Sequence, residues 1–229
     1  MKKPRIVITA GPTREYLDPV RFLSNPSTGK MGFALARAAV EGGYEVTLIA
    51  GPVVLKTPRG VKRVDVVSAR DMLEAVEAAV FADNRETVLI SSAAIADWRP
   101  AHLATKKLKK AEMSSVLKLV RNPDILKTVH RRIVRERRKN IRLVGFAAET
   151  GDPALEAQRK CRAKGLEFIV ANDVTEKGAG FGSNTNRVRL FFKDGRSLSF
   201  PLATKLALAR KIFKIKELVI VKNPKGVKI

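Results

Sequence analysis

The stretch RIVITAGP, residues 5–12, decides the fold that this sequence predicts. Its run of β-branched and apolar residues stops at a Gly-Pro pair, which is typical of a buried strand that ends in a turn. A long polar loop follows, and small and apolar residues then recur at helical spacing over residues 29–41 until a Gly-Gly pair ends the helix. Residues 44–50 (YEVTLIA) predict the next strand. Strand, helix and strand in this order predict a parallel βαβ unit.

The same alternation continues along the rest of the chain. Further strands are expected at residues 62–67, 87–92, 141–147 and 167–171, and further helices at residues 69–83, 122–139, 154–163 and 202–215. Residues 105–121 are rich in lysine and then alternate apolar with polar residues, which indicates a strand in a small excursion from the sheet. Residues 187–192 and 197–200 flank an Asp-Gly turn and predict a hairpin.

These elements predict the α/β class, with a Rossmann-like, doubly wound and mainly parallel sheet, a small additional β excursion and a C-terminal hairpin. The length of 229 residues, with 45% hydrophobic residues, fits a single domain over residues 1–229. A basic tail from about residue 216 is expected to be mobile.

Cysteine content and the amino terminus indicate the compartment. Cys161 is the only cysteine, so the chain has no internal disulfide and a reducing compartment is expected. The first residues, MKKPRIVITAG, run directly into the first strand, and we predict neither a targeting peptide nor a membrane span. The expected location is therefore cytoplasmic.

The chain carries 45 Lys and Arg residues against 22 Asp and Glu, a formal net charge of +23. Residues 106–142 hold fourteen of the basic residues and three of the acidic ones. One interpretation is a basic nucleic-acid-binding protein on an α/β scaffold. The other is a solvated basic face, because aromatic residues for base stacking are sparse there and many of the charges fall on the polar face of a helix. We regard nucleic acid as the less favoured partner.

Ligands of doubly wound sheets bind at the carboxyl ends of the strands, here the loops after Ala10, Ala50 and Ser92. A dinucleotide cofactor is disfavoured, because the second strand is followed by Gly-Pro rather than by an acid for the ribose. A Walker A phosphate loop is rejected, because Met31 stands where that motif needs Ser or Thr. Gly11 in the first turn, with Gly29 and Gly32 at the helix start, nevertheless makes a place where backbone N–H groups and the helix dipole can receive a phosphate.

The polar loop before that helix places Asn25 close to Arg21, Ser27 and Thr28. Loops of this length in compact domains are usually functional, although Asn-Pro also forms simple turns. The next such segment is SSAAIADWRP, residues 91–100, whose small residues let a flat ring approach the backbone. Its aspartate either binds a base or sugar or caps a helix.

Lysines supply the remaining candidate groups. If the run KKLKK, residues 106–110, is a strand, Lys107 and Lys109 share one face, although such a run is usually solvated. Lys160 and Lys164 lie one helical turn apart and can meet a polyphosphate together. A glycine-rich loop, residues 178–188, is expected to fold over a bound ligand.

These segments occur together and in order in one known family. The strings AGPTRE, DPVRF, SNPSTGKMG, ADWRP, KKLKK, NPDIL, GFAAET and ANDV resemble the phosphopantothenoylcysteine synthetase (phosphopantothenate–cysteine ligase) family of the bacterial CTP-dependent type, from residue 6 to about residue 200. In bacteria that enzyme is often the C-terminal half of a bifunctional protein with a flavin-dependent decarboxylase. A decarboxylase partner in trans is therefore one expectation.

The resemblance assigns roles to individual residues. It implies Asn25, Lys107 and Arg21 as catalytic, with Asn25 holding an acyl-nucleotide intermediate. It implies substrate binding by Asn25, Ser27, Thr28, Gly29 and Asn172. It implies CTP contacts from Gly11, Ser91, Ser92, Ala93, Asp97, Lys107, Pro123, Asp124, Ile125, Leu126, Phe146, Lys160 and Lys164. No protein ligand set for a metal is visible. Two departures from the family pattern are Lys106, where an acid is expected, and Asn184, where an aspartate is expected.

The reaction implied by the resemblance joins L-cysteine to 4'-phosphopantothenate through an acyl cytidylate, in coenzyme A biosynthesis. CTP would be the co-substrate, Mg²⁺ would accompany its triphosphate, and the protein would be a homodimer. The C-terminal hairpin offers an edge for pairing in such a dimer.

Overall fold

A computed structural model of the chain describes residues 3–110 and 115–219. The strands of the main sheet are β1 (Arg5–Ala10), β4 (Val46–Ala50), β5 (Val61–Asp65), β6 (Thr87–Ser91), β9 (Ile141–Glu149), β10 (Phe168–Asp173), β11 (Thr185–Phe192) and β12 (Ser197–Thr204). Four further strands are short: β2 (Arg14–Tyr16), β3 (Phe22–Ser24), β7 (Trp98–Pro100) and β8 (Leu119–Arg121). The helices are α1 (Lys30–Glu41), α2 (Ala69–Val80), α3 (Ile125–Arg135), α4 (Ala154–Ala163), α5 (Lys205–Ile212) and α6 (Lys216–Val219).

The main sheet confirms the predicted fold class. Its strand order is β12-β11-β10-β9-β6-β1-β4-β5, and the six strands from β10 to β5 are parallel. The antiparallel hairpin of β11 and β12 extends the sheet at one edge, as expected. The central strand β1 is buried along its whole length, because its residues face helices on both sides.

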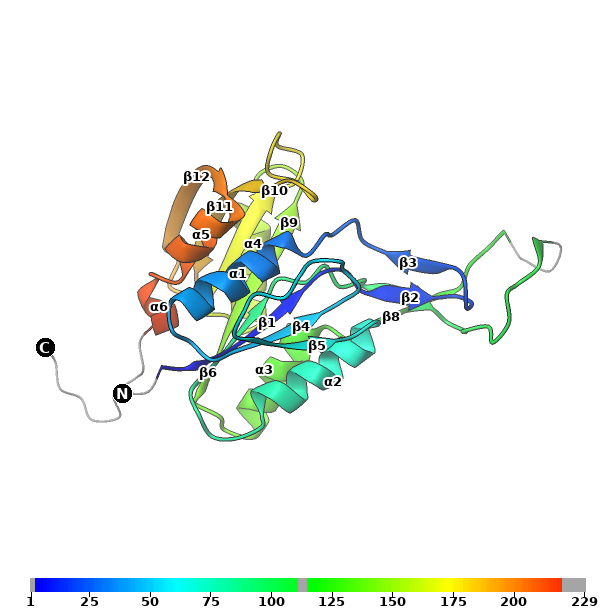
Figure 1. Ribbon diagram of the computed structural model, residues 1–229, viewed down its shortest axis with the longest axis horizontal. Coiled ribbons are helices and arrows are strands. Elements are labelled where there is room, and N and C mark those ends of the chain that lie inside the picture. Colours follow the sequence, from blue (N-terminus) through cyan, green and yellow to red (C-terminus); the bar gives the residue numbers. More distant parts are fainter. Residues whose placement is uncertain (1–2, 111–114, 220–229) are drawn as a thin grey trace, which may run out of the picture.

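Helices cover both faces of the sheet and create two hydrophobic cores (Figure 1). On one face α1 and α5 pack against residues such as Ile8 and Leu48. On the other face α2, α3 and α4 bury residues such as Val7 and Leu89. Because alternate residues of β1 point to opposite faces, Ile6 and Ile8 enter one core and Val7 the other.

The short strands form an arm that projects from one end of the sheet (Figure 1). We define the arm as residues 14–24 and 98–121, of which residues 111–114 lie outside the described part. β2 pairs with β3 and β7 pairs with β8, both antiparallel. The polar segment before α1 is therefore not a continuous loop. Within residues 105–121, where a strand was expected, only the last three residues form one. Residues 106–110 do not form a strand, so the strand alternation that was expected to place Lys107 and Lys109 on one face is wrong.

Several predicted helices are too long. α3 ends at Arg135 rather than at residue 139, because Arg137 adopts a left-handed φ of 52°. Arg138 N then donates to Ile133 O, and Arg137 N to Val134 O, which closes the helix in a Schellman pattern. α2 stops at Val80, and α5 begins at Lys205 behind a Thr204 cap.

Residues 216–219 are the part of the expected mobile tail that the structure describes. They form α6, in which Leu218 is buried in the core and Glu217 pairs with Arg196 at 2.5 Å. Arg142 donates to the carbonyl of Glu217, which anchors the turn further. Residues 220–229 lie outside the described part.

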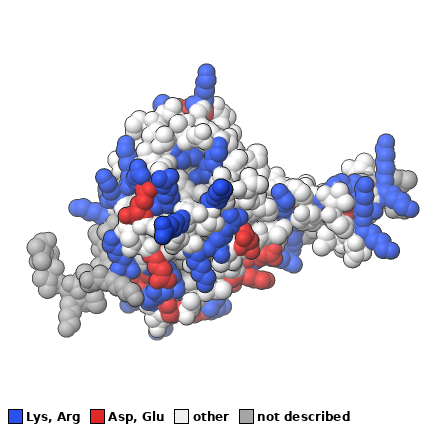
Figure 2. Space-filling model, in the orientation of Figure 1, with Lys and Arg blue, Asp and Glu red and all other residues white. Residues whose placement is uncertain are grey.

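Basic side chains are distributed over the visible face, interspersed with acidic ones, and continue along the arm (Figure 2). The basic stretch 106–142 is divided between the arm and α3, which lie apart in Figure 1. The basic residues concentrated in sequence are therefore spread over different parts of the fold.

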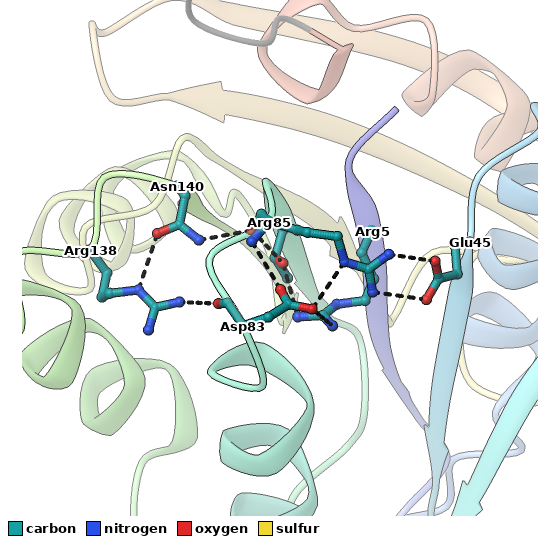
Figure 3. A network of polar contacts seen from close by, with 7 residues as sticks. Arg5, Glu45, Asp83, Arg85, Arg138 and Asn140 are labelled. Atoms are coloured by element: carbon teal, nitrogen blue, oxygen red, sulfur yellow. Dashed lines mark hydrogen bonds and ion pairs between the residues drawn. The ribbon is translucent and has the colours of Figure 1, made fainter. Parts of the chain in front are cut away.

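Some of the basic residues hold the amino ends of the strands together (Figure 3). Arg85 pairs with Glu45 at 2.8 Å and with Asp83 at 3.0 Å, and Arg5 contacts the same Asp83 at 3.3 Å. Arg138, which follows α3, donates to the carbonyl of Asp83 and so joins this network. These charged groups form stabilising contacts at the amino ends of the strands, at the end of the sheet opposite to their carboxyl ends.

Candidate active site

Two adjoining hollows lie at the carboxyl ends of the parallel strands. The large hollow has a volume of about 420 Å³ and the small hollow about 200 Å³. They share a wall made of Ala93, Ile95, Asp97 and Phe146. The sequence places small residues, Ser92 to Ala94, directly after β6, at this shared wall.

The amino end of α1 opens into the large hollow. Gly29 is its N-cap with a left-handed φ of 77°, and no side chain caps the helix. Gly32 lets the first turn approach the sheet, because a Cβ there would lie 2.4 Å from that of Ala10 and 2.9 Å from Ser92 Oγ. Backbone N–H groups at this helix start therefore face the hollow and favour an anion.

Asn25 lines the large hollow, and its Nδ2 donates to Ala94 O at 3.1 Å. Ala94 N in turn donates to Gly11 O at 2.9 Å, so the loop after β6 is tied to the turn after β1. Ser27 and Thr28 line the same wall. The hydrogen bond to Ala94 O fixes the position of the Asn25 carboxamide on the wall of the large hollow.

The glycine-rich loop also lines the large hollow. Ala179, Gly180, Phe181 and Gly182 line it, and Asn172 Nδ2 donates to Ala179 O at 2.9 Å. This segment therefore borders the large hollow, while its closure over a ligand stays a prediction.

The small hollow receives the amino end of α3. Asp124 caps this helix, with its carboxylate accepting from Lys127 N at 3.0 Å, and also pairs with Lys164 at 2.9 Å. Burial alone would raise the pKa of Asp124, but these two partners lower it. Pro123, Ile125 and the neighbouring Ser91 complete this wall.

Lys160 lines the large hollow and is held by Glu149 at 2.6 Å. Although burial alone would lower the pKa of Lys160, the bond to Glu149 raises it, with a smaller contribution from Glu156. Lys160 is thus a fixed positive charge on the wall of one hollow, and Lys164, one helical turn away, borders the other.

The structure brings most of the predicted site residues to these walls. Residues on the large hollow are Asn25, Ser27, Thr28, Gly29, Ser92, Ala93, Asp97, Phe146, Lys160 and Asn172. Residues on the small hollow are Ser91, Ala93, Asp97, Pro123, Asp124, Ile125, Leu126, Phe146 and Lys164. Asp97 caps no helix, because β7 follows it.

Three predicted residues do not line either hollow. Gly11 lies behind the wall, with its nitrogen 3.4 Å from where a Cβ of Gly29 would lie. Arg21 binds Asp18 and the carbonyl of Leu108 within the arm. Lys107 is exposed on the same arm. The roles assigned to these residues stay predictions.

Sequence reasoning missed Lys30 and Lys205, which both line the large hollow. Lys30 lies in the SNPSTGKMG string without an assigned role, and Lys205 opens a helix that was expected to begin at residue 202. A lysine at the first position of a helix carries no signal that distinguishes it from a surface lysine.

The fold and the two hollows define a class: a doubly wound α/β protein with an anion-receptive cleft at the carboxyl edge of its sheet. The profile of the family described as "DNA/pantothenate metabolism flavoprotein C-terminal domain" matches residues 1–218, and the chain belongs to that family.

Individual relatives agree with this family. The "Coenzyme A biosynthesis bifunctional protein CoaBC" of Bacillus subtilis (strain 168) is 49% identical over 208 residues, which cover 90% of this chain and 49% of that protein. The protein of the same name from Escherichia coli (strain K12) is 45% identical over 213 residues, 92% of this chain and 50% of that protein. The chain thus spans about half the length of these relatives.

A solved structure matches nearly end to end. The C-terminal domain of a coenzyme A biosynthesis bifunctional protein CoaBC has a TM-score of 0.77 at 42% identity, with 95% of this chain and 96% of that chain covered. Among the described residues, no helix is both long and apolar enough to cross a membrane.

Proposed function

We propose that this chain is a phosphopantothenate–cysteine ligase, joining L-cysteine to 4'-phosphopantothenate in coenzyme A biosynthesis. The observation that carries the proposal is the shared wall of the two hollows, at Ala93, Asp97 and Phe146. A nucleotide in the small hollow and an acid substrate in the large hollow would meet there. The names of the relatives and the motif resemblance support the choice of substrates.

In the first step the substrate carboxylate attacks the α-phosphate of the nucleotide, and pyrophosphate leaves. The product is an acyl nucleotide, which gives the carboxyl carbon a leaving group that a free carboxylate lacks. The amino end of α3 with Lys164, and Lys160 beside it, would hold the negative phosphates. Lys107 is proposed to stabilise charge on the α-phosphate. Because Lys107 lies on the arm, this role requires the arm to reach the nucleotide.

In the second step the amine of cysteine attacks the acyl carbon, and the nucleoside monophosphate leaves. Asn25 lies on the large hollow with a carboxamide that can donate to an acyl or phosphate oxygen without carrying charge. We propose that it holds the acyl nucleotide in place for the amine, with Arg21 assisting from the arm.

CTP is the proposed nucleotide, because the small residues after β6 and Phe146 resemble the cytosine pocket of CTP-dependent members. Among the described residues no group of three or more His, Cys, Asp or Glu side chains is placed to hold a metal ion. Asp97 is the carboxylate at the shared wall, so it is the residue that would approach Mg²⁺ carried by the triphosphate. Bound Mg²⁺ would neutralise charge as pyrophosphate departs.

A homodimer is proposed, with the arm as its contact surface. Half of the large hydrophobic side chains that are exposed among the described residues belong to the arm: Val20, Phe22, Trp98, Leu103, Val116, Leu117 and Leu119. A second copy covering this surface would remove them from water. The exposed hairpin edge at β12 is the alternative surface.

The cellular context is proposed from the chemistry. A single buried thiol fits a reducing cytoplasm. The relatives are named as bifunctional proteins, which supports a decarboxylase that acts in the same pathway. The decarboxylase would be either fused to this chain or a partner in trans. Nucleic-acid binding stays the alternative, supported by the net charge of +23.

The experiment is a pyrophosphate-release assay with phosphopantothenate, cysteine and Mg²⁺, using CTP and ATP separately. The proposal expects release that requires phosphopantothenate and is faster with CTP at subsaturating concentration. Equal rates with both nucleotides would remove the CTP preference, and no release with either would remove the ligase assignment. Tight binding of an unrelated DNA duplex at physiological salt would then favour the alternative.

A further inference from the structure

Two lysines face the same end of the large hollow from the first positions of two helices. Lys205 begins α5 and is only 8% exposed, and Lys30 begins α1 and is half-buried. Lys205 Nζ donates to Ser183 O at 2.5 Å. Lys30 Nζ donates to Gly182 O at 2.6 Å and to Asn184 Oδ1 at 2.8 Å. Both ammonium groups thus hold one short segment of the glycine-rich loop.

The partners of these two lysines are neutral oxygens. Within residues 3–110 and 115–219, no carboxylate forms an ion pair with either one, and Asp97 is the only acid on the wall of the hollow. Burial lowers the pKa of Lys205, and the charge of Lys30 lowers it further. Two like charges held close together, one of them buried, are unfavourable unless an anion compensates them.

The amino end of α1 adds to this preference for an anion. Its N-cap Gly29 offers no side chain to the first N–H groups of the helix, while Ser27 and Thr28 line the same wall. Hydroxyl donors, uncapped backbone N–H groups and two ammonium groups together match the oxygens of a phosphate monoester.

The proposed reaction brings two phosphorylated groups into the cleft. In the proposed function, the amino end of α3, Lys160 and Lys164 bind the triphosphate. The remaining group is the terminal phosphate of the pantothenate derivative. We propose that Lys30 and Lys205 bind this phosphate monoester, so that the pair selects phosphopantothenate over free pantothenate. The inference rests on the proposed function and adds the group that determines its substrate specificity.

Two substitutions test the assignment, Lys205→Met and Lys30→Met, which keep most of the length of the side chain and remove its charge. Lys211→Met is the matched control, because Lys211 is an exposed lysine on the same helix α5. Titration calorimetry then measures the Kd of phosphopantothenate, pantothenate and CTP for each protein, after circular dichroism has verified the fold. Lys30→Met carries the test if loss of the buried Lys205 impairs folding.

The expected result is a Kd for phosphopantothenate that rises about tenfold to a hundredfold in each folded variant, as for loss of one hydrogen bond to a charged group. The Kd of pantothenate and of CTP should change little, and the control should match the wild type. Unchanged phosphopantothenate binding, or weakened CTP binding alone, would overturn the assignment. Failure of the wild-type chain to bind phosphopantothenate would instead refute the proposed function itself.

Discussion

The side-chain amide of Asn25 donates a hydrogen bond to the main-chain carbonyl of Ala94 across 3.1 Å. The same carbonyl accepts from Thr13 N at 3.3 Å. One bond thereby joins the segment before α1 to the loop after β6, and both segments line the large hollow. A carboxamide has two N–H donors and one acceptor oxygen, so this bond uses only one donor.

Replacing Asn25 by Asp should impair the second chemical step more than the first. The carboxylate has the same size but loses the donor, and it places negative charge beside Ala94 O and an anionic intermediate. Loss of such a donor costs on the order of a hundredfold to a thousandfold in rate. Pyrophosphate release and cysteine-dependent CMP formation are measured separately. Asn140→Asp is the control, because Asn140 lies at the opposite end of the sheet. If Asn25→Asp slowed both steps equally, or slowed neither, Asn25 would be only a turn residue.

Lys107→Gln should slow pyrophosphate release by about tenfold or more, because a group placed for a transition state is rarely replaced by a mobile neighbour. The comparison is Lys106→Gln, which removes an equally exposed charge at the adjacent position. Steady-state release with phosphopantothenate and CTP is the readout. Near-normal activity of Lys107→Gln would transfer the role to Lys109 or end it.

Charges introduced on the arm should dissociate the proposed homodimer. Leu103 is 65% exposed and Val116 is 77% exposed, so Glu at either position should be tolerated in an isolated chain. In a dimer joined through the arm, the new carboxylate would be buried without a partner. Light scattering at micromolar concentration should give a dimer for the wild type and a monomer for Leu103→Glu and Val116→Glu.

The hairpin serves as the comparison surface. Leu198→Glu places the same charge on β12 and should leave the dimer intact. A monomer for Leu198→Glu, with dimers for both arm variants, would assign the interface to the hairpin edge instead.

Asp18 should stabilise the arm only while it is ionised. Its carboxylate is fully buried and accepts from Val20 N, Arg21 N and the Arg21 guanidinium. The bond to Arg21 holds the pKa of Asp18 well below its usual value of 3.8, outweighing burial, and the backbone donors lower it further. A depressed folded-state pKa means that this stabilisation is present above about pH 4 and is lost as the pH falls toward the folded-state pKa.

Thermal unfolding of the wild type and Asp18→Asn across pH 7 to pH 3 measures this effect. The wild type should have the higher Tm at pH 7, and the difference should shrink below about pH 4. A difference that stays constant or grows on acidification would show that the ionised Asp18 does not stabilise the fold.

The central βαβ pattern could be predicted because residues 5–10 form a fully buried strand, whose apolar run is visible in the sequence. Most of the cleft could be predicted from this pattern, because the carboxyl ends of parallel strands meet at one edge and bring Ser91 and Phe146 together. Asn25 and Lys160 then required the family resemblance, because neither stands out from local pattern alone.

Only part of the arm was predicted, as a small β excursion within residues 105–121, because its four strands have three residues each and alternate too briefly to give a periodic signal. Proximity in sequence was also misleading there. Arg21 lies four residues from Asn25, but β3 separates them, and the guanidinium turns to Asp18 within the arm. Lys205 depends on a tertiary contact with a loop more than twenty residues earlier, which no local pattern reveals.

A quenched single-turnover experiment tests the central claim, that the two hollows form one acyl-nucleotide ligase site. The wild-type chain, in excess, is mixed with CTP, phosphopantothenate and Mg²⁺, and cysteine is added after a delay. The account predicts pyrophosphate and acyl cytidylate before cysteine is added, and phosphopantothenoylcysteine with an equal amount of CMP afterwards. Pyrophosphate release that does not depend on phosphopantothenate, or the absence of an acyl cytidylate that cysteine consumes, would contradict it.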